Sequence, residues 1–144
     1  MSTGDDRLAA ALEAEHAAIF GYGAVGAHAA GDVGLAQAAE LAHRNRRDAL
    51  IVRLTSKGVT VPAAQPVYTL PFPVTDLVSA LKLATTIEDR CAAIWRLALP
   101  DTTGDERKLA LDALIDCATR GTGFRKAAGT TPSTIAFPGQ VSSG

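Results

Sequence analysis

Two glutamates stand alone in apolar rows of predicted helices. Spacings of three and four residues place each row on one face of a helix, which packs against a core. A carboxylate buried in such a row needs a cation, a metal ion or a proton, because an unpaired buried charge is costly. The first row comprises Leu8, Leu12, Glu15, Ile19, Tyr22 and Gly26, and the second comprises Leu81, Ala84, Glu88, Cys91, Trp95 and Ala98. Glu15 and Glu88 are therefore the first candidates for a buried site.

A metal pair is one chemistry that such glutamates support. In carboxylate di-metal bundles, two helices supply one glutamate each and the other two supply Glu-x-x-His. Glu40 and His43 form one such motif. If the chain reverses near Gly31, however, Glu15 lies level with Asp48, and Glu40 lies about 12 Å away along the helix axis. Paired metal ions lie about 4 Å apart, so Glu40 and His43 are predicted to be too distant.

The residues predicted to be level with Glu15 are mostly basic, whereas Glu88 is predicted to lie level with about residue 115, next to the acidic Asp116. Guanidinium groups bind carboxylates through two hydrogen bonds and stay charged, so arginines would neutralise these acids and repel a metal. The favoured prediction is a metal-free buried polar layer made of Glu15, Arg44, Arg47, Glu88 and Asp116. The alternative is an iron or manganese site drawn from Glu15, Glu40, His43, Asp48, Glu88 and Asp116.

The elements that position these residues are predicted to be helices in an all-α fold. Aromatic residues make up 5% of the chain and alanine is its most frequent residue, a composition that favours helices over strands. A bundle is expected over residues 1–127 and a polar tail over 128–144. Asp32, Thr75 and Thr103 are the predicted helix N-caps. The four helices are expected over about 5–29, 33–57, 76–99 and from about 104 onward.

The segment Gly58–Val74 is the longest predicted connection and sets the topology. Bundle connections usually have about 2–8 residues, whereas this one reaches ~56 Å when extended, against ~37 Å for a helix of about 25 residues. It is therefore long enough to return along the whole bundle. A long crossover between the second and third helices predicts a ferritin-like four-helix bundle. The expected anchors of the crossover are Val67, Tyr68, Leu70 and Phe72.

Charge and hydropathy exclude several classes of partner. The formal net charge is −1, so the whole chain carries no field that would attract nucleic acid. No apolar run approaches the ~20 residues that span a bilayer, and the first residues lack the basic and apolar regions of a secretion signal. Two cysteines are too few for a disulfide framework. We expect a cytoplasmic protein with neither a nucleic-acid nor a membrane partner.

Several motifs together resemble a known family. They are Glu15-His16 with Phe20-Gly-Tyr22-Gly, His43-Arg44-x-Arg46-Arg47-Asp48, the crossover motif Leu70–Asp76, Glu88-Asp89 with Trp95, and Ala136–Gly139. In these motifs the chain resembles an Ala-rich actinobacterial family of unknown function that is grouped with the ferritin-like superfamily. The resemblance implies a ferritin-like four-helix fold and, as in several members, a homodimer. It implies no established reaction.

The sequence therefore leads to two functional hypotheses. The first is an uncharacterised, metal-free bundle that acts by protein association. Its apolar tail patch, Ile135–Pro138, either folds back along the bundle or docks on a second subunit. The second is an oxidoreductase with a divergent carboxylate di-metal site.

Overall fold

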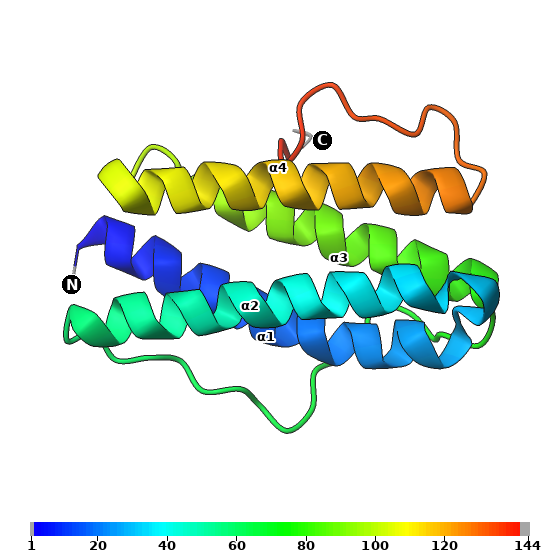
Figure 1. Ribbon diagram of the computed structural model, residues 1–144, viewed down its shortest axis with the longest axis horizontal. Helices are drawn as coiled ribbons and strands as arrows, with labels where there is room; N and C mark the ends of the chain where they lie inside the picture. The colour runs from blue at the N-terminus through cyan, green and yellow to red at the C-terminus, as the bar shows by residue number, and fades with distance from the viewer. Residues whose placement is uncertain (1, 142–144) are drawn as a thin grey trace.

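Within the described part of the chain, four long helices make up the fold (Figure 1). The computed structural model describes residues 2–141. No strand occurs in this range, which confirms the all-α prediction. The elements are α1 (Thr3–His28), a short 3-10 turn η1 (Ala30–Asp32), α2 (Val33–Ser56), α3 (Leu77–Ala98) and α4 (Gly104–Ala127).

Side-chain caps fix the start of two helices. The Ser2 hydroxyl accepts a hydrogen bond from the Asp5 amide, and the Asp5 carboxylate accepts one from the Ser2 amide in return. Asp76 and Ser79 form the same reciprocal box at α3, one residue after the predicted cap. Such a cap contributes about 1 kcal/mol. Asp32 and Thr103 stand at N-cap positions but make no side-chain capping bond.

The helices run in two antiparallel pairs. α1 packs against α2, α3 packs against α4, and α1 also packs against α3. The crossover returns along the molecule, so that α2 and α3 run in the same direction (Figure 1). α2 and α4 approach each other much less closely. Along this α2–α4 seam, ion pairs join the helices: Arg46 to Asp116 at 3.0 Å and Arg53 to Glu106 at 2.8 Å.

The core draws on all four helices and buries both predicted apolar rows except for Ile19 and Gly26 of the first, which are half-buried. Long aliphatic and aromatic side chains fill it, while alanines let the helix axes approach closely. Its largest fully buried apolar side chains are Trp95, Tyr22, Phe124, Leu8, Leu12, Leu50, Leu54 and Leu83.

The crossover is an ordered strap on the helices. Leu70 and Phe72 pack against the core, and the Tyr68 ring lies 5.6 Å from the Phe20 ring on α1. The His16 ring also lies within hydrogen-bond distance of the Pro62 carbonyl, at 3.1 Å. Val67, by contrast, is 70% exposed, so the prediction that it anchors the strap is wrong.

The tail that follows α4 folds back onto α3 of the same chain. Arg96 on α3 donates a hydrogen bond to the Pro138 carbonyl at 3.1 Å. Gly139 sits against the α3 backbone with φ +77°, and a Cβ there would lie 2.6 Å from the Ala92 carbonyl oxygen. Only glycine meets both demands without strain. Of the two predicted fates of the tail, the structure shows the fold-back, although Phe137 remains 63% exposed.

Candidate functional site: a buried histidine between two glutamates

His43 lies between Glu15 and Glu88 at the centre of the fold. The three side chains come from α2, α1 and α3 and have no exposed surface. Nδ1 of His43 is hydrogen-bonded to Glu15 Oε2, and Nε2 lies 2.8 Å from Glu88 Oε1. Both nitrogens of the ring therefore face carboxylate oxygens, which accept hydrogen bonds but do not donate them when ionised.

Two aromatic side chains complete the hydrogen bonding of the glutamates. The Trp95 indole donates to Glu15 Oε1 at 2.9 Å, and the Tyr22 hydroxyl donates to Glu88 Oε1 at 2.5 Å. The Tyr22 ring also stacks on the His43 ring, with centroids 5.5 Å apart. Every oxygen of Glu15 and Glu88 has a donor, because Arg120 approaches Glu88 Oε2 at 3.5 Å. Full satisfaction of this kind lets buried charges persist in a core.

The geometry favours a protonated His43. Burial alone lowers the pKa of a histidine, but hydrogen bonds and attraction from Glu15 and Glu88 outweigh it and raise the pKa of His43 to about 10. Burial likewise raises the pKa of Glu88, yet the His43 hydrogen bond and the nearby Arg120 bring that pKa below its usual value. At neutral pH the histidine is thus an imidazolium that donates one hydrogen bond to each glutamate.

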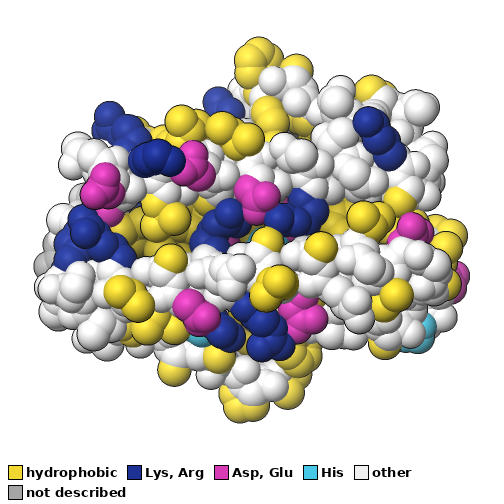
Figure 2. Space-filling view, in the orientation of Figure 1, with side chains coloured by type: hydrophobic (Ala, Val, Ile, Leu, Met, Phe, Trp, Pro, Cys, Tyr) yellow, Lys and Arg dark blue, Asp and Glu magenta, His cyan; other side chains and the backbone are white. Residues whose placement is uncertain are grey.

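A second layer of charge closes the site on the side of the α2–α4 seam. Arg46 and Arg120 both donate to Asp116 Oδ2, at 3.0 Å and 2.8 Å. Figure 2 shows this gathering of basic and acidic side chains over the seam. The whole site then holds three acids, Glu15, Glu88 and Asp116. Three cations balance them: His43, Arg46 and Arg120. The site is therefore neutral through side chains of the chain itself.

Two thiols lie beside the charged cluster. Cys91 and Cys117 are free and buried, and Cys91 Sγ lies 4.0 Å from the Ala14 carbonyl oxygen. The neighbouring Cys117 and burial together raise the pKa of Cys91 well above its ordinary value. A thiol with a raised pKa is a poor nucleophile at neutral pH. The pair therefore packs as small apolar side chains.

The structure corrects the predicted partners of the glutamates. Arg44 is an exposed residue that binds Glu40 at 2.7 Å, and Arg47 binds Asp48 at 2.9 Å. Neither arginine touches Glu15 or Glu88 in the described chain. Arg44 and Arg47 are therefore not part of the polar layer, and His43, which was predicted to lie too far along α2, takes their place.

The error lies in where the chain reverses between α1 and α2. The contact between Glu15 and His43 centres the reversal at Ala29, whereas the prediction placed it between Gly31 and Asp32. Ala30 has a positive φ of 48°, and η1 already leads into α2. In an antiparallel pair, the numbers of two facing residues add up to twice the number of the residue at the centre of the reversal. A shift of that centre by about two and a half residues therefore changes the facing residue by about five positions.

The register between α3 and α4 also differs from the predicted one. Glu88 was predicted to lie level with about residue 115, but the Glu88 Cβ lies against Gly121, and Arg120 reaches the carboxylate. Asp116 therefore meets the layer only through the two arginines. Sequence reasoning missed Arg120 and left Arg46 unassigned. The spacing of four between Asp116 and Arg120 was the available signal, since it places both on one helix face.

The donor set does not fit the predicted metal pair. Of the alternative ligands, Glu40 and Asp48 are held by surface arginines and Asp116 by two further arginines. Glu15, His43 and Glu88 remain, and both ring nitrogens of His43 are engaged. Among residues 2–141, one set has ligand-like spacing: Glu15, His43 and Cys91, whose ligand atoms lie within 4.8 Å of one another. That set could hold one ion, after the histidine and the thiol had lost their protons.

The fold and the site define an all-helical protein of four long helices with an ion-paired histidine at its centre. The chain belongs to the DUF4439 family, a domain of unknown function, whose model matches residues 7–142. It is similar to the crystal structure of a conserved hypothetical protein, rv2844, from Mycobacterium tuberculosis. The two are 37% identical with a TM-score of 0.84, over 88% of this chain and 98% of that chain.

These similarities fit the predicted resemblance to an actinobacterial family of unknown function. The family match covers the four helices, except for the first residues of α1, and most of the tail. No curated protein matches the chain. Within residues 2–141, none of the helices has the length and apolarity that crossing a membrane requires.

Proposed function

We propose that this protein is a metal-free, ferritin-like four-helix protein that acts by associating with another protein chain. The position of His43 is the observation that carries the proposal. In a ferritin-like metal site, ions lie between glutamates from the first and third helices and neutralise them. Here the imidazolium of His43 lies between Glu15 and Glu88 and hydrogen-bonds both.

Topology supports the ferritin-like assignment. The crossover between α2 and α3 reverses the hairpin order (Figure 1), and long crossovers of this kind distinguish ferritin-like bundles from simple up-and-down ones. Glu15 and Glu88 also stand near the middle of the helices that supply single glutamates in such sites. The free thiols Cys91 and Cys117 suit a reducing compartment such as the cytoplasm.

The α2–α4 face is our candidate for the association surface, with a second copy of the chain as the partner. Several large apolar side chains of these two helices are exposed, although α2 and α4 pack only loosely on each other. They are Val33, Leu35, Leu41, Val52, Leu111 and Ile115. Exposed apolar residues flanked by charges are typical of protein interfaces. A homodimer formed by this face would cover Arg46 and Arg120 at the α2–α4 seam.

An oxidoreductase with bound iron or manganese is the second candidate. The convergence of Glu15, His43 and Cys91 ligand atoms favours it. Metal binding there competes directly with protonation of His43, because a ligand nitrogen must be unprotonated. The two candidates therefore make opposite predictions for the same residue.

Elemental analysis and sedimentation test the proposal together. Protein expressed with added iron and manganese and purified without chelator is expected to hold well under 0.1 equivalent of either metal per chain. Sedimentation is expected to give a dimer mass that Ile115→Glu lowers to a monomer mass. Val78→Glu is the matched control, since Val78 is equally apolar and 75% exposed but lies at the start of α3. A stoichiometric metal, or a monomer at every concentration, contradicts the proposal.

A further inference from the structure

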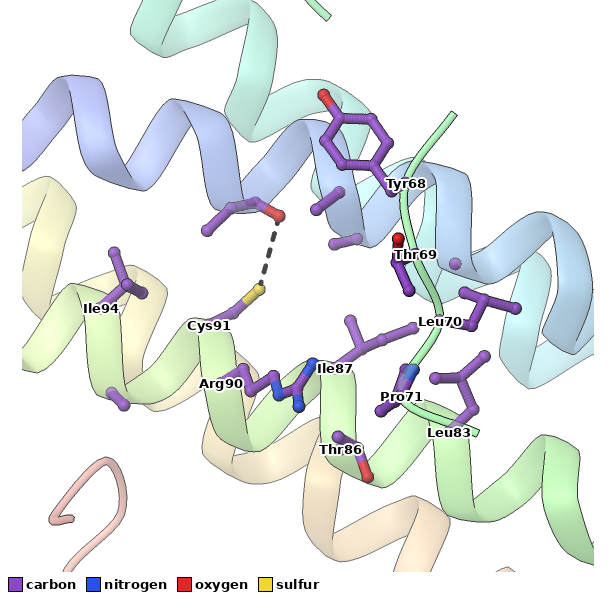
Figure 3. Close-up of a pocket in the computed structure, with 15 residues that line it drawn as sticks. Tyr68, Thr69, Leu70, Pro71, Leu83, Thr86, Ile87, Arg90, Cys91 and Ile94 are labelled. Carbon is purple, nitrogen blue, oxygen red and sulfur yellow. Dashed lines mark hydrogen bonds between the residues drawn. The ribbon is translucent and has the colours of Figure 1, made fainter. Parts of the chain in front are cut away.

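An apolar cavity of about 440 Å³ lies between α1, α3 and the crossover strap. Tyr68, Thr69, Leu70 and Pro71 of the strap form one wall, and Ile87 and Cys91 of α3 face them across the space (Figure 3). Ligand pockets in proteins have volumes of about 300–1,000 Å³ and mostly apolar walls. The cavity is therefore large enough for a small molecule.

The shape of the cavity follows from small side chains on α1. Ala14, Ala17 and Ala18 line it and leave a gap where larger residues would reach α3. The gap closes at Gly21, where an added Cβ would lie 2.7 Å from Ile87 Cδ1. The space thus follows the α1–α3 boundary beneath the strap and suits an elongated, apolar molecule.

Among the described residues that line the cavity, Arg90 is the one charged side chain. Its guanidinium lies beside Ile87 (Figure 3), and the residue is exposed to solvent. Within residues 2–141, Arg90 makes no ion pair or side-chain hydrogen bond. The adjacent acid, Asp89, is bound by Arg125. An unpaired cation beside an apolar space is complementary to a molecule with one anionic end.

We propose that this cavity binds an apolar monocarboxylate, the chemical class of a medium-chain fatty acid. The hydrocarbon chain lies against Ala17, Cys91 and Ile94 beneath the strap. The carboxylate lies at the solvent-facing edge and pairs with Arg90. Because the cavity walls are apolar, binding depends on chain length as well as on charge.

Calorimetric titration of the full chain with octanoate, butyrate and octan-1-ol tests this assignment. Octanoate is expected to bind once per chain, and each added CH₂ is expected to raise the affinity about two- to fourfold. Octanol, which has no charge, is expected to bind about two- to fivefold more weakly than octanoate, as for a solvent-exposed ion pair.

Two variants separate the charge from the cavity. Arg90→Gln is expected to remove the preference for octanoate over octanol, whereas Lys108→Gln, a control on exposed α4 surface, retains it. Ala17→Phe fills the cavity and is expected to abolish binding of both ligands, with helical content and melting temperature checked in parallel. Absence of octanoate binding, or a preference that survives Arg90→Gln, overturns the proposal. If octanoate dissociates a dimer and octanol does so equally well, the cavity is the binding site of a second chain and not of a fatty acid.

Discussion

His43 on α2 donates a hydrogen bond from Nε2 to Glu88 on α3 across 2.8 Å, and neither side chain has any exposed surface. The same ring is hydrogen-bonded to Glu15 through Nδ1. Helices α1, α2 and α3 are therefore tied at one level by a single protonated side chain. The protonated ring lies where a metal site would need an empty position and unprotonated ligands.

Replacing His43 should be far more damaging than replacing a surface arginine. His43→Leu leaves Glu15 and Glu88 buried without their shared cation, and removing one partner of a buried ion pair costs about 3–5 kcal/mol. Arg47→Leu, whose partner Asp48 is solvated, should cost less than about 1 kcal/mol. Urea denaturation at pH 7 measures both. Equal losses in the two variants would show that His43 is not the central cation.

Stability should fall as the pH rises above neutrality. The pKa of His43 is about 10 in the folded protein against 6.5 for an ordinary histidine, so the folded state binds more protons than the unfolded state between these values. Its contribution is complete below about pH 6.5 and is lost as the pH approaches 10. Urea denaturation at pH 6 and pH 9 should show this decline, which His43→Leu should flatten.

On the acidic side the sign reverses. The pKa of Glu88 is lowered in the folded protein, so its contribution is present above its unfolded pKa of about 4.5 and is lost as the pH falls below that value. Stability measured from pH 3 to pH 6 should rise with pH. Glu88→Gln should weaken this dependence, and a rise of unchanged size in that variant would contradict the assignment.

Tyr22→Phe should report on the charge of Glu88. The substitution keeps the ring that stacks on His43 and deletes only the hydroxyl that donates to the carboxylate. A hydrogen bond to a charged group contributes about 1.5–3 kcal/mol. Tyr68→Phe is the matched control, because the Tyr68 hydroxyl accepts a hydrogen bond from the exposed backbone N–H of Gln65. This substitution should cost less than about 0.5 kcal/mol. Thermal denaturation compares the two.

Gly139→Ala should release the tail from α3. The added Cβ meets the Ala92 carbonyl oxygen, and the positive φ at this position disfavours any other residue. Limited proteolysis should cleave the variant faster within residues 130–140, while the four helices stay intact. Gly23→Ala is the control: its added Cβ meets nothing within 4 Å, and it should stabilise α1 by about 0.5–1 kcal/mol. A tail equally protected in wild type and Gly139→Ala contradicts the docking.

Much of this fold could be predicted because helix periodicity is a local property. The apolar rows on α1 and α3, the crossover and the burial of Glu15 and Glu88 all follow from spacings within one segment. The anchors of the crossover were harder to assign. Val67 is apolar but points to solvent, because an irregular strap has no fixed period that selects one face.

The partners of the glutamates depend on register between helices, which no single helix determines. The reversal at Ala29 uses an alanine with positive φ at Ala30, where the nearest turn signal in the sequence was Gly31. A small error in the centre of the reversal is doubled in the number of the facing residue on α2. For this reason the prediction placed Arg47, and not His43, beside Glu15. Arg120 was missed for the same reason at the second reversal.

The protonation state of His43 decides whether an imidazolium or a metal ion neutralises Glu15 and Glu88. Nitrogen-15 NMR of the ring at pH 8, with and without added Zn²⁺ as a diamagnetic probe, distinguishes imidazolium from neutral imidazole and from a metal ligand. We predict that both ring nitrogens carry protons and that Zn²⁺ leaves their shifts unchanged. A neutral ring at pH 8, or a nitrogen shift that follows one equivalent of Zn²⁺, would contradict the account and favour a metal site at Glu15, His43 and Cys91.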